Sequence, residues 1–435
     1  MRGEKRYYGK ADTLVQIAVY VFLINALCKY FLPNSLTKIL PIFAVLLAGV
    51  RTASPFVLPI KKIDKPILVF LFVWFLGCLY SPAMSKGMGY VFSFGIAFIF
   101  GIYISQKNID ENKVMRFLAI GCTILAVFIL IQPVSPELVS HVNRLFSYSA
   151  NEYASMNAWT RNGWYTGLFP DRAPAAFFCS ILIGTGLYYL YCNYKTEGNK
   201  FQRLFGVIFV FVGAYGVLLT VKRGLLIAAG IAAFVTFVVY KKANKAPIWR
   251  ICLAAVVVVF VIWIVFSNME VTQVMVARFV DNDNLLTDRD VIYRNIFEKF
   301  WSSPLIGTGT ASAFSLLGIG GHNIYLTVLM ENGILGFAVL ISVLGYAFFS
   351  TVQLVLRFGS YEYHKGIPFL LFSLYTQVFF LVYGMSGNPL YDNYILYFYL
   401  FAIFIVKNSE YHFEKINCKE RKSNERVYNN ISVCL

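Results

Sequence analysis

The chain has 435 residues, of which 58% are hydrophobic and only 14% charged, and its formal net charge is +16. Soluble globular proteins carry about 25% charged residues, so this composition excludes a water-soluble surface. The apolar runs are continuous and lack the alternation of membrane β-strands. Since backbone groups in lipid must be satisfied internally, we predict an all-α, polytopic membrane helical bundle.

The chain begins with a basic stretch that leads directly into an apolar segment, 14–31, without a small-residue cleavage site. This pattern predicts a retained first span and not a cleaved signal. Further apolar segments follow, which brings the expectation to about 12 transmembrane helices. They are expected at 36–50, 66–80, 87–105, 114–132, 173–193, 204–221, 224–240, 248–267, 333–356, 367–385 and 391–406.

The basic residues indicate the direction of these spans, because Lys and Arg concentrate in cytoplasmic loops. With a cytoplasmic N-terminus, 26 of the 38 Lys and Arg residues and half of the 22 Asp and Glu residues fall inside. The inner face then carries +15 and the outer face +1. We predict a multi-pass plasma (inner) membrane protein with both termini in the cytoplasm. The basic excess is explained by this topology, so nucleic acid is not an expected partner.

Two outward-facing segments, 133–172 and 268–322, are too long for simple turns, and such loops are commonly functional. They divide the predicted chain into six parts. These are a five-span region at 1–132, the first outer loop at 133–172, a four-span region at 173–267, the second outer loop at 268–322, the C-terminal spans at 323–406 and a basic tail at 407–435.

The second outer loop contains a predicted amphipathic helix at 285–301, which a capping box of Thr287 and Asp290 would open. Arg294 lies on its polar face, whereas Arg289 projects into its apolar stripe. This arginine belongs either to an interfacial helix, from which it snorkels, or to an anion-binding site. The expected apolar stripe consists of Ile292, Tyr293, Ile296, Phe297, Phe300 and Trp301.

Two further positions on the outer face carry candidate functional residues. A new helix is expected to begin near Asn323, which places His322 at a helix N-terminus; histidine is a poor cap, so we favour a functional role over capping. Lys222 and Arg223 occupy a very short turn between two apolar spans. Charges so close to hydrocarbon mark functional sites, although such side chains can also reach lipid phosphates.

The first outer loop combines aromatic residues with arginines, among them Trp164, Arg161 and Arg172. Aromatic rings beside arginines suit sugar binding, and an ordinary aromatic belt at the membrane interface is the alternative. The sequence shows no metal-ligand spacing, no phosphate-binding Walker loop and no serine nucleophile elbow.

Three segments together resemble the superfamily of O-antigen polymerases and O-antigen ligases. One runs from 289 to 336, with Ser-Pro-Leu-Ile-Gly-Thr-Gly after the arginine helix, then His-Asn-Ile-Tyr-Leu and Glu-Asn-Gly-Ile-Leu-Gly. The second, Leu-Thr-Val-Lys-Arg-Gly, has Lys222 where the family has serine. The third, Thr-Gly-Leu-Phe-Pro-Asp-Arg-Ala, has Arg172 where the family often has asparagine.

The resemblance implies a GT-C-like, metal-independent membrane glycosyltransferase with no cofactor and an active site on the outer face. Its donor would be a glycan on undecaprenyl pyrophosphate, and its acceptor a glycan or lipid A core; a chain-length regulator and a flippase are expected partners. Arginines suit the leaving pyrophosphate. The expected catalytic residues are His322, Arg289 and Arg223, and the expected substrate-binding residues are Lys222, Arg161, Arg172, Arg294, Asn323 and Trp164.

Among these activities we favour polymerisation of the repeat units of O-antigen, capsule or exopolysaccharide, because it requires no assumption about an outer membrane. An O-antigen ligase shares the chemistry and differs in its acceptor. A lipid-linked oligosaccharide flippase is the alternative of another class. A flippase would line its interior with charges at mid-membrane depth and have short loops, whereas here the charges lie in long outer segments.

Overall fold

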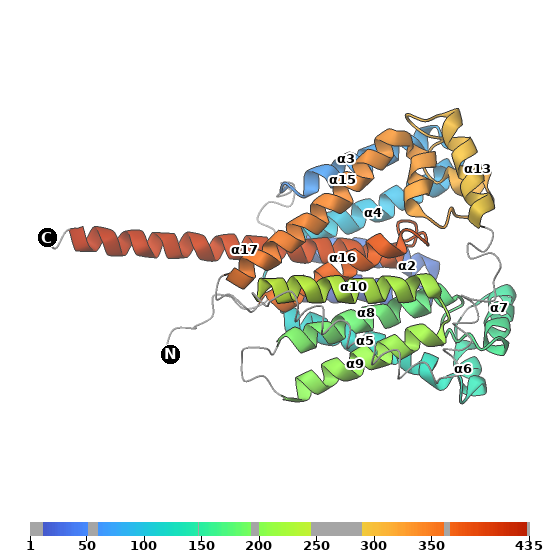
Figure 1. Ribbon diagram of the computed structural model, residues 1–435, viewed down its shortest axis with the longest axis horizontal. Helices are drawn as coiled ribbons and strands as arrows, with labels where there is room; N and C mark the ends of the chain where they lie inside the picture. The colour runs from blue at the N-terminus through green and yellow to red at the C-terminus, as the bar shows by residue number, and fades with distance from the viewer. Residues whose placement is uncertain are drawn as a thin grey trace.

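The computed structural model describes residues 12–50, 60–146, 148–192, 200–244, 289–360 and 366–432, and within these ranges it contains helices and no strand (Figure 1). The all-α expectation is therefore confirmed for the described part. Every predicted span except 248–267, which lies outside the described residues, coincides with a helix. These helices are α1 (Thr13–Leu27), α2 (Asn34–Gly49), α3 (Asp64–Leu79), α4 (Met84–Ile104), α5 (Glu111–Ile131), α8 (Arg172–Cys192), α9 (Lys200–Leu219), α10 (Arg223–Ala243), α15 (Ile324–Ser360), α16 (Ile367–Tyr383) and α17 (Asn393–Ser432).

The composition of these helices fits a membrane interior. Six described helices are long and apolar enough to cross a bilayer, namely α4, α5, α8, α9, α10 and α15, and α1, α2 and α16 are shorter apolar helices. Large apolar side chains such as Leu46, Phe72 and Phe211 are more than half exposed on the bundle surface, where lipid would cover them. The chain is thus a multi-pass membrane protein, and the count of twelve spans stays a prediction.

Helix α8 lies at the centre of the bundle, packed against α5, α9 and α16. In α8, 72% of the most apolar stretch is buried. The corresponding share in the other long apolar helices is 33% to 44%. The Tyr375 hydroxyl of α16 donates to the Ser180 carbonyl of α8 at 2.9 Å. Phe177 of α8 makes edge-to-face ring contacts with Tyr394 and Phe398 of α17. These aromatic contacts join α8 to α17.

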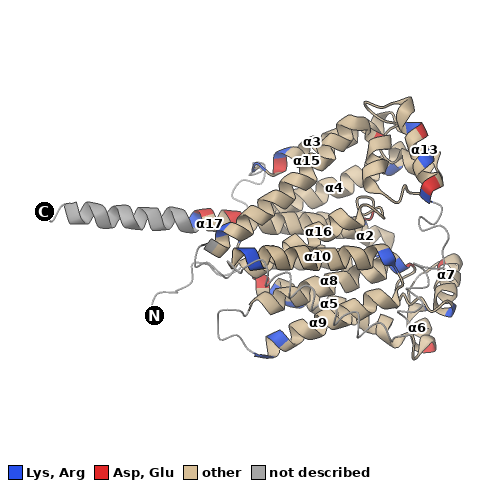
Figure 2. Ribbon diagram, in the orientation of Figure 1, with Lys and Arg blue, Asp and Glu red and all other residues tan. Residues whose placement is uncertain are grey.

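Charged residues gather at the two ends of the bundle, and the middle of the helices is almost free of them (Figure 2). We call the end that carries α6 (Pro136–Asn143), α7 (Ala150–Arg161), α13 (Arg289–Ser302) and α14 (Ser312–Leu316) the loop end. The predicted outer loops are therefore largely helical where they are described. Helix α7 begins with a capping box of Ser149 and Glu152, a signal that our sequence analysis overlooked.

The opposite end contains a buried ion pair between α3 and α17. The Lys407 ammonium lies 2.6 Å from Oδ1 of Asp64, and both side chains are fully buried. Oδ2 of Asp64 also accepts the backbone N–H of Lys61 at 2.7 Å. An ion pair without solvent is tolerated only when both partners are present and hydrogen-bonded, so this contact fixes how the two helices meet.

Candidate active site

The segment that follows α13 is tied to a break in helix α15. The N–H of Thr308 donates to the carbonyl of Met330 at 2.9 Å. The N–H of Gly309 donates to the carbonyl of Glu331 at 2.8 Å. Helix α15 breaks at Gly333, whose φ of 63° and ψ of −167° are not helical. The two glycine-rich motifs of the sequence therefore form one unit.

Glycine is required at this break because the two backbones almost touch. A Cβ on Gly333 would lie 2.2 Å from the carbonyl oxygen of Leu305, and one on Gly307 would lie 2.3 Å from the backbone of Glu331. Both glycines also have a positive φ, which disfavours other residues. The close approach of the two backbones alone accounts for these glycines.

The carboxylate of Glu331 holds the next part of the loop. It is fully buried and accepts the N–H of Ala311 at 2.8 Å and the N–H of Ala313 at 3.0 Å. Tyr391, just before α17, donates its hydroxyl to the same carboxylate. Glu331 thus has a structural role in this fold: it joins the loop before α14 to the start of α17.

His322 lies where this loop enters α15, as the sequence predicts. Its φ of 51° is left-handed, a rare conformation for a residue other than glycine. The helix cap is Asn323, whose Oδ1 accepts the N–H of Tyr325 at 3.0 Å and of Leu326 at 3.1 Å. His322 is therefore not a cap, and its backbone has an unusual conformation of the kind that clusters at functional sites.

Positive charges surround His322 at the loop end. Partial burial, then the charges of Arg289 and Lys222, lower the pKa of the imidazole below its ordinary 6.5, while the carboxylate of Asp171 acts in the opposite direction. At neutral pH the ring is therefore uncharged and can accept a proton. The fold brings together three predicted site residues, His322, Arg289 and Lys222, from three separate segments.

The Lys222–Arg223 turn is built on a strained residue. Val221 has a φ of 51°, which is unfavourable for a β-branched side chain. Lys222 precedes α10, and Arg223 is its first residue. A Cβ on Gly224 would lie 2.4 Å from the Ser386 hydroxyl, so the turn fits closely against the segment after α16. Such backbone strain costs free energy and is typical of functional sites, so it indicates that the position of these two basic side chains matters.

Arg172 and the tryptophans form a stack beside this turn. The Arg172 guanidinium carbon lies 4.2 Å from the ring centroid of Trp164 and 4.4 Å from that of Trp159. Trp164 also packs on Leu218 and Val221 below the turn. Arg172 covers the tryptophan rings, so stacking of a sugar on Trp164 stays a prediction.

The remaining predicted substrate-binding arginines, Arg161 and Arg294, are exposed on α7 and α13. In α13, Ile296 and Phe300 are buried as expected, but Phe297 and Trp301 are 42% and 71% exposed. The apolar stripe of this helix is therefore narrower than predicted, because only its Ile296 side faces α15 through Met330. The proposed capping residue Thr287 lies outside the described residues.

The sequence analysis missed two charged residues near the loop end, Asp392 and Lys29. Asp392 lies within electrostatic range of Lys222, Asp171 and Lys29. Both Asp392 and Lys29 stand at the end of an apolar span, where an isolated charge is itself a signal of function. Among the described residues, no group of three His, Cys, Asp or Glu side chains could hold a metal ion.

Two known groups of proteins are similar to this chain in sequence. A family model described as O-antigen ligase matches residues 208–341, which include the Lys222 turn, Arg289 and His322. The chain is also 20% identical over 400 residues to an O-antigen polymerase of Salmonella muenchen, a match that covers 85% of this chain and 95% of that protein.

Fold and site together define a multi-pass α-helical membrane protein with a cationic cluster and a neutral histidine at one end of the bundle. By both matches the chain is similar to O-antigen ligases and O-antigen polymerases. The family resemblance predicted from the sequence is thereby confirmed.

Proposed function

We propose that the protein polymerises lipid-linked repeat units of a surface polysaccharide at its loop end, which faces away from the cytoplasm. The observation that carries the proposal is the position of His322, which has a left-handed backbone conformation at the entrance to α15 and lies within electrostatic range of Arg289 and Lys222. A neutral base next to clustered cations suits a reaction that removes a proton from one substrate and releases an anion from the other.

In the proposed reaction, an acceptor sugar hydroxyl attacks the anomeric carbon of a glycan on undecaprenyl pyrophosphate. The bond between that carbon and the pyrophosphate oxygen breaks as the new glycosidic bond forms. The imidazole of His322 takes the hydroxyl proton, and Arg289, Lys222 and Arg223 stabilise the charge on the departing lipid pyrophosphate. The donor bond is already activated, so the reaction requires no nucleotide.

Other predicted binding residues take supporting parts in this proposal. Arg172 and Trp164, which are stacked on each other, border the turn that carries Lys222. Asn323 holds the helix terminus next to His322 through its two side-chain hydrogen bonds. Arg161 and Arg294 are exposed at the loop end, where they could contact the glycan beyond the reacting sugars.

Ligase activity is the second candidate, and the description of the matching family model favours it. The two activities share donor, leaving group and base, and differ only in the acceptor. A deletion strain distinguishes them. Loss of a polymerase leaves single repeat units attached to the final acceptor, whereas loss of a ligase leaves long chains on the lipid carrier and no attached glycan.

The chemical step is tested with purified protein and a purified lipid-linked repeat unit. General-base removal typically costs about 10²- to 10⁴-fold in rate, so we expect His322→Ala to lose most transfer while it folds normally. The matched control is His141→Ala, since His141 is exposed on α6 and bonds only within that helix, to the Glu137 carbonyl. Wild-type rates from His322→Ala would refute the role of the base.

A further inference from the structure

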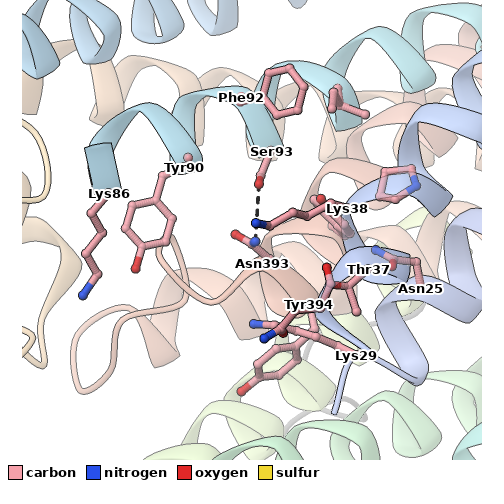
Figure 3. Close-up of a pocket in the computed structure, with 15 residues that line it drawn as sticks. Asn25, Lys29, Thr37, Lys38, Lys86, Tyr90, Phe92, Ser93, Asn393 and Tyr394 are labelled. Carbon is pink, nitrogen blue, oxygen red and sulfur yellow. Dashed lines mark hydrogen bonds between the residues drawn. The ribbon is translucent and has the colours of Figure 1, made fainter. Parts of the chain in front are cut away.

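A separate cavity of about 530 Å³ opens between α1, α2, α4 and α17 near the loop end (Figure 3). Three lysines line it, Lys29 after α1, Lys38 on α2 and Lys86 on α4. Among the described residues, no carboxylate lines the cavity. Within the described part of the chain, none of the three ammonium groups has a carboxylate oxygen within 4 Å. Three lysines on one cavity wall, without a carboxylate in direct contact, indicate an anionic ligand.

The polar groups of the cavity wall are also incompletely bonded. Asn25 is 3% exposed, and its Oδ1 has no hydrogen-bond partner among the described residues. Asn393 donates from Nδ2 to Ser93 at 3.4 Å, and its own Oδ1 is likewise unpartnered in the described part. Buried amides are normally hydrogen-bonded, so these two indicate a polar ligand with donors, such as sugar hydroxyls.

The apolar surroundings fit a lipid attached to that ligand. Tyr90 and Tyr394 contribute rings to the cavity, and Phe92 lines it while remaining 61% exposed. Next to it on α2, Ile39 and Phe43 are 55% and 47% exposed on the bundle surface. A ligand could therefore keep its head group among the lysines and its hydrocarbon tail along α2 and α4. A volume of this size is typical of ligand sites.

We propose that this cavity binds the pyrophosphate of the acceptor, a second lipid-linked glycan, while the cluster around His322 binds the pyrophosphate of the donor. This inference rests on the proposed polymerase function. The acceptor keeps its pyrophosphate, and its attacking hydroxyl lies in a sugar distant from that group. Its anchor must therefore be separate from the site where the donor pyrophosphate leaves.

The start of α17 lies between the two anion sites. Asn393 and Tyr394 line the lysine cavity. Asp392, the residue before them, acts electrostatically on Lys29 of the cavity and also on Lys222 of the cluster around His322. One short segment thus connects the cavity with the cluster around His322.

The test measures binding of farnesyl pyrophosphate to the purified full chain in a neutral detergent. An Arg289→Ala, Lys222→Gln background weakens the donor site, so the remaining binding reports the cavity. In that background we expect the double substitution Lys38→Gln and Lys86→Gln to weaken the affinity for farnesyl pyrophosphate at least about tenfold. Both lysines are exposed, so these changes should not prevent folding. The control is Lys113→Gln, since Lys113 is exposed on α5 at the opposite end.

Unchanged affinity in the double lysine variant would overturn the proposal. Phosphatidylglycerol distinguishes the source of the phosphate: we expect it not to displace farnesyl pyrophosphate when added in equal amount, and complete displacement would make the cavity a general phospholipid site. The two proposals fail differently. Lysine-dependent binding without any glycan transfer refutes the polymerase function and leaves the cavity as a pyrophosphate site without an acceptor role. Transfer with lysine-independent binding refutes the cavity assignment alone.

Discussion

Tyr391 donates its hydroxyl to the buried carboxylate of Glu331, and this contact joins the start of α17 to the broken helix α15. The residue after Tyr391 is Asp392, which faces the cationic cluster. The same carboxylate holds the loop before α14 through Ala311 and Ala313. One buried side chain therefore positions two of the segments near His322.

Replacement of Glu331 should show this positioning role. In Glu331→Gln an NH₂ group replaces one acceptor oxygen, so at least one buried N–H loses its partner, at a cost of about 1–3 kcal/mol. We expect a lower melting temperature together with reduced glycan transfer. Glu298→Gln on the exposed face of α13 is the control and should match wild type. A Glu331→Gln protein with wild-type thermal stability would contradict this role.

The pH dependence of transfer should report the environment of His322. The pKa of this imidazole lies below 6.5 because of burial and the charges of Arg289 and Lys222. A base must be neutral, so the rate falls only as pH drops through that lowered pKa, and it is constant near pH 7. Lys222→Gln removes one positive charge, which raises the pKa of His322 and moves the acid limb of kcat/KM to higher pH.

Lys299→Gln, which removes an exposed charge from α13, serves as the control for that profile and should leave the acid limb in place. An acid limb that stays fixed, or moves to lower pH, in Lys222→Gln would show that the titrating group is not His322.

The geometry of the arginines should matter beyond their charge. Arg289→Lys and Arg223→Lys keep a positive charge but lose the planar fork that holds two phosphate oxygens. We expect each to lower transfer about 10- to 100-fold, because a charge-assisted hydrogen bond is worth about 1.5–3 kcal/mol, and to accumulate single repeat units in cells. Arg357→Lys, at an exposed position of α15, should behave as wild type. Full activity of both site variants would make these arginines structural.

The direction of the bundle is tested by cysteine labelling in a background without native cysteines. Ala154 is exposed on α7 at the loop end, and Glu414 is exposed on α17 beyond the opposite end. A membrane-impermeant maleimide applied to intact spheroplasts should label Ala154→Cys and spare Glu414→Cys until the cells are permeabilised. The reverse pattern would place the site in the cytoplasm and refute the proposed topology.

The helices of this bundle could be predicted from sequence because long apolar runs have few alternatives in lipid. The position of His322 at the entrance to α15 could be predicted from its neighbours. The break at Gly333 could not, since a glycine inside an apolar run gives no sign of which backbone will approach it. The role of Glu331 was hidden for the same reason: its hydrogen-bond donors lie 18 and 20 residues earlier and 60 residues later.

The lysine cavity shows a different limit of sequence reasoning. Lys29, Lys38 and Lys86 come from three segments, and each alone resembles a basic residue at a span end. Only packing of α2 against α4, and of α1 and α4 against α17, brings them to one cavity. In the first outer loop, the sequence indicated aromatic residues beside arginines, but it did not indicate that Arg172 would stack on Trp159 and Trp164.

The contact between Asp64 and Lys407 has a consequence for the order of assembly during synthesis. Asp64 enters the membrane early in translation, and Lys407 follows 343 residues later. Until then the carboxylate of Asp64 lacks its buried counter-charge, which is costly in a dehydrated setting. The opposite end of the bundle therefore closes last, and a nascent chain halted before Lys407 should remain open there and be a target for quality-control proteolysis.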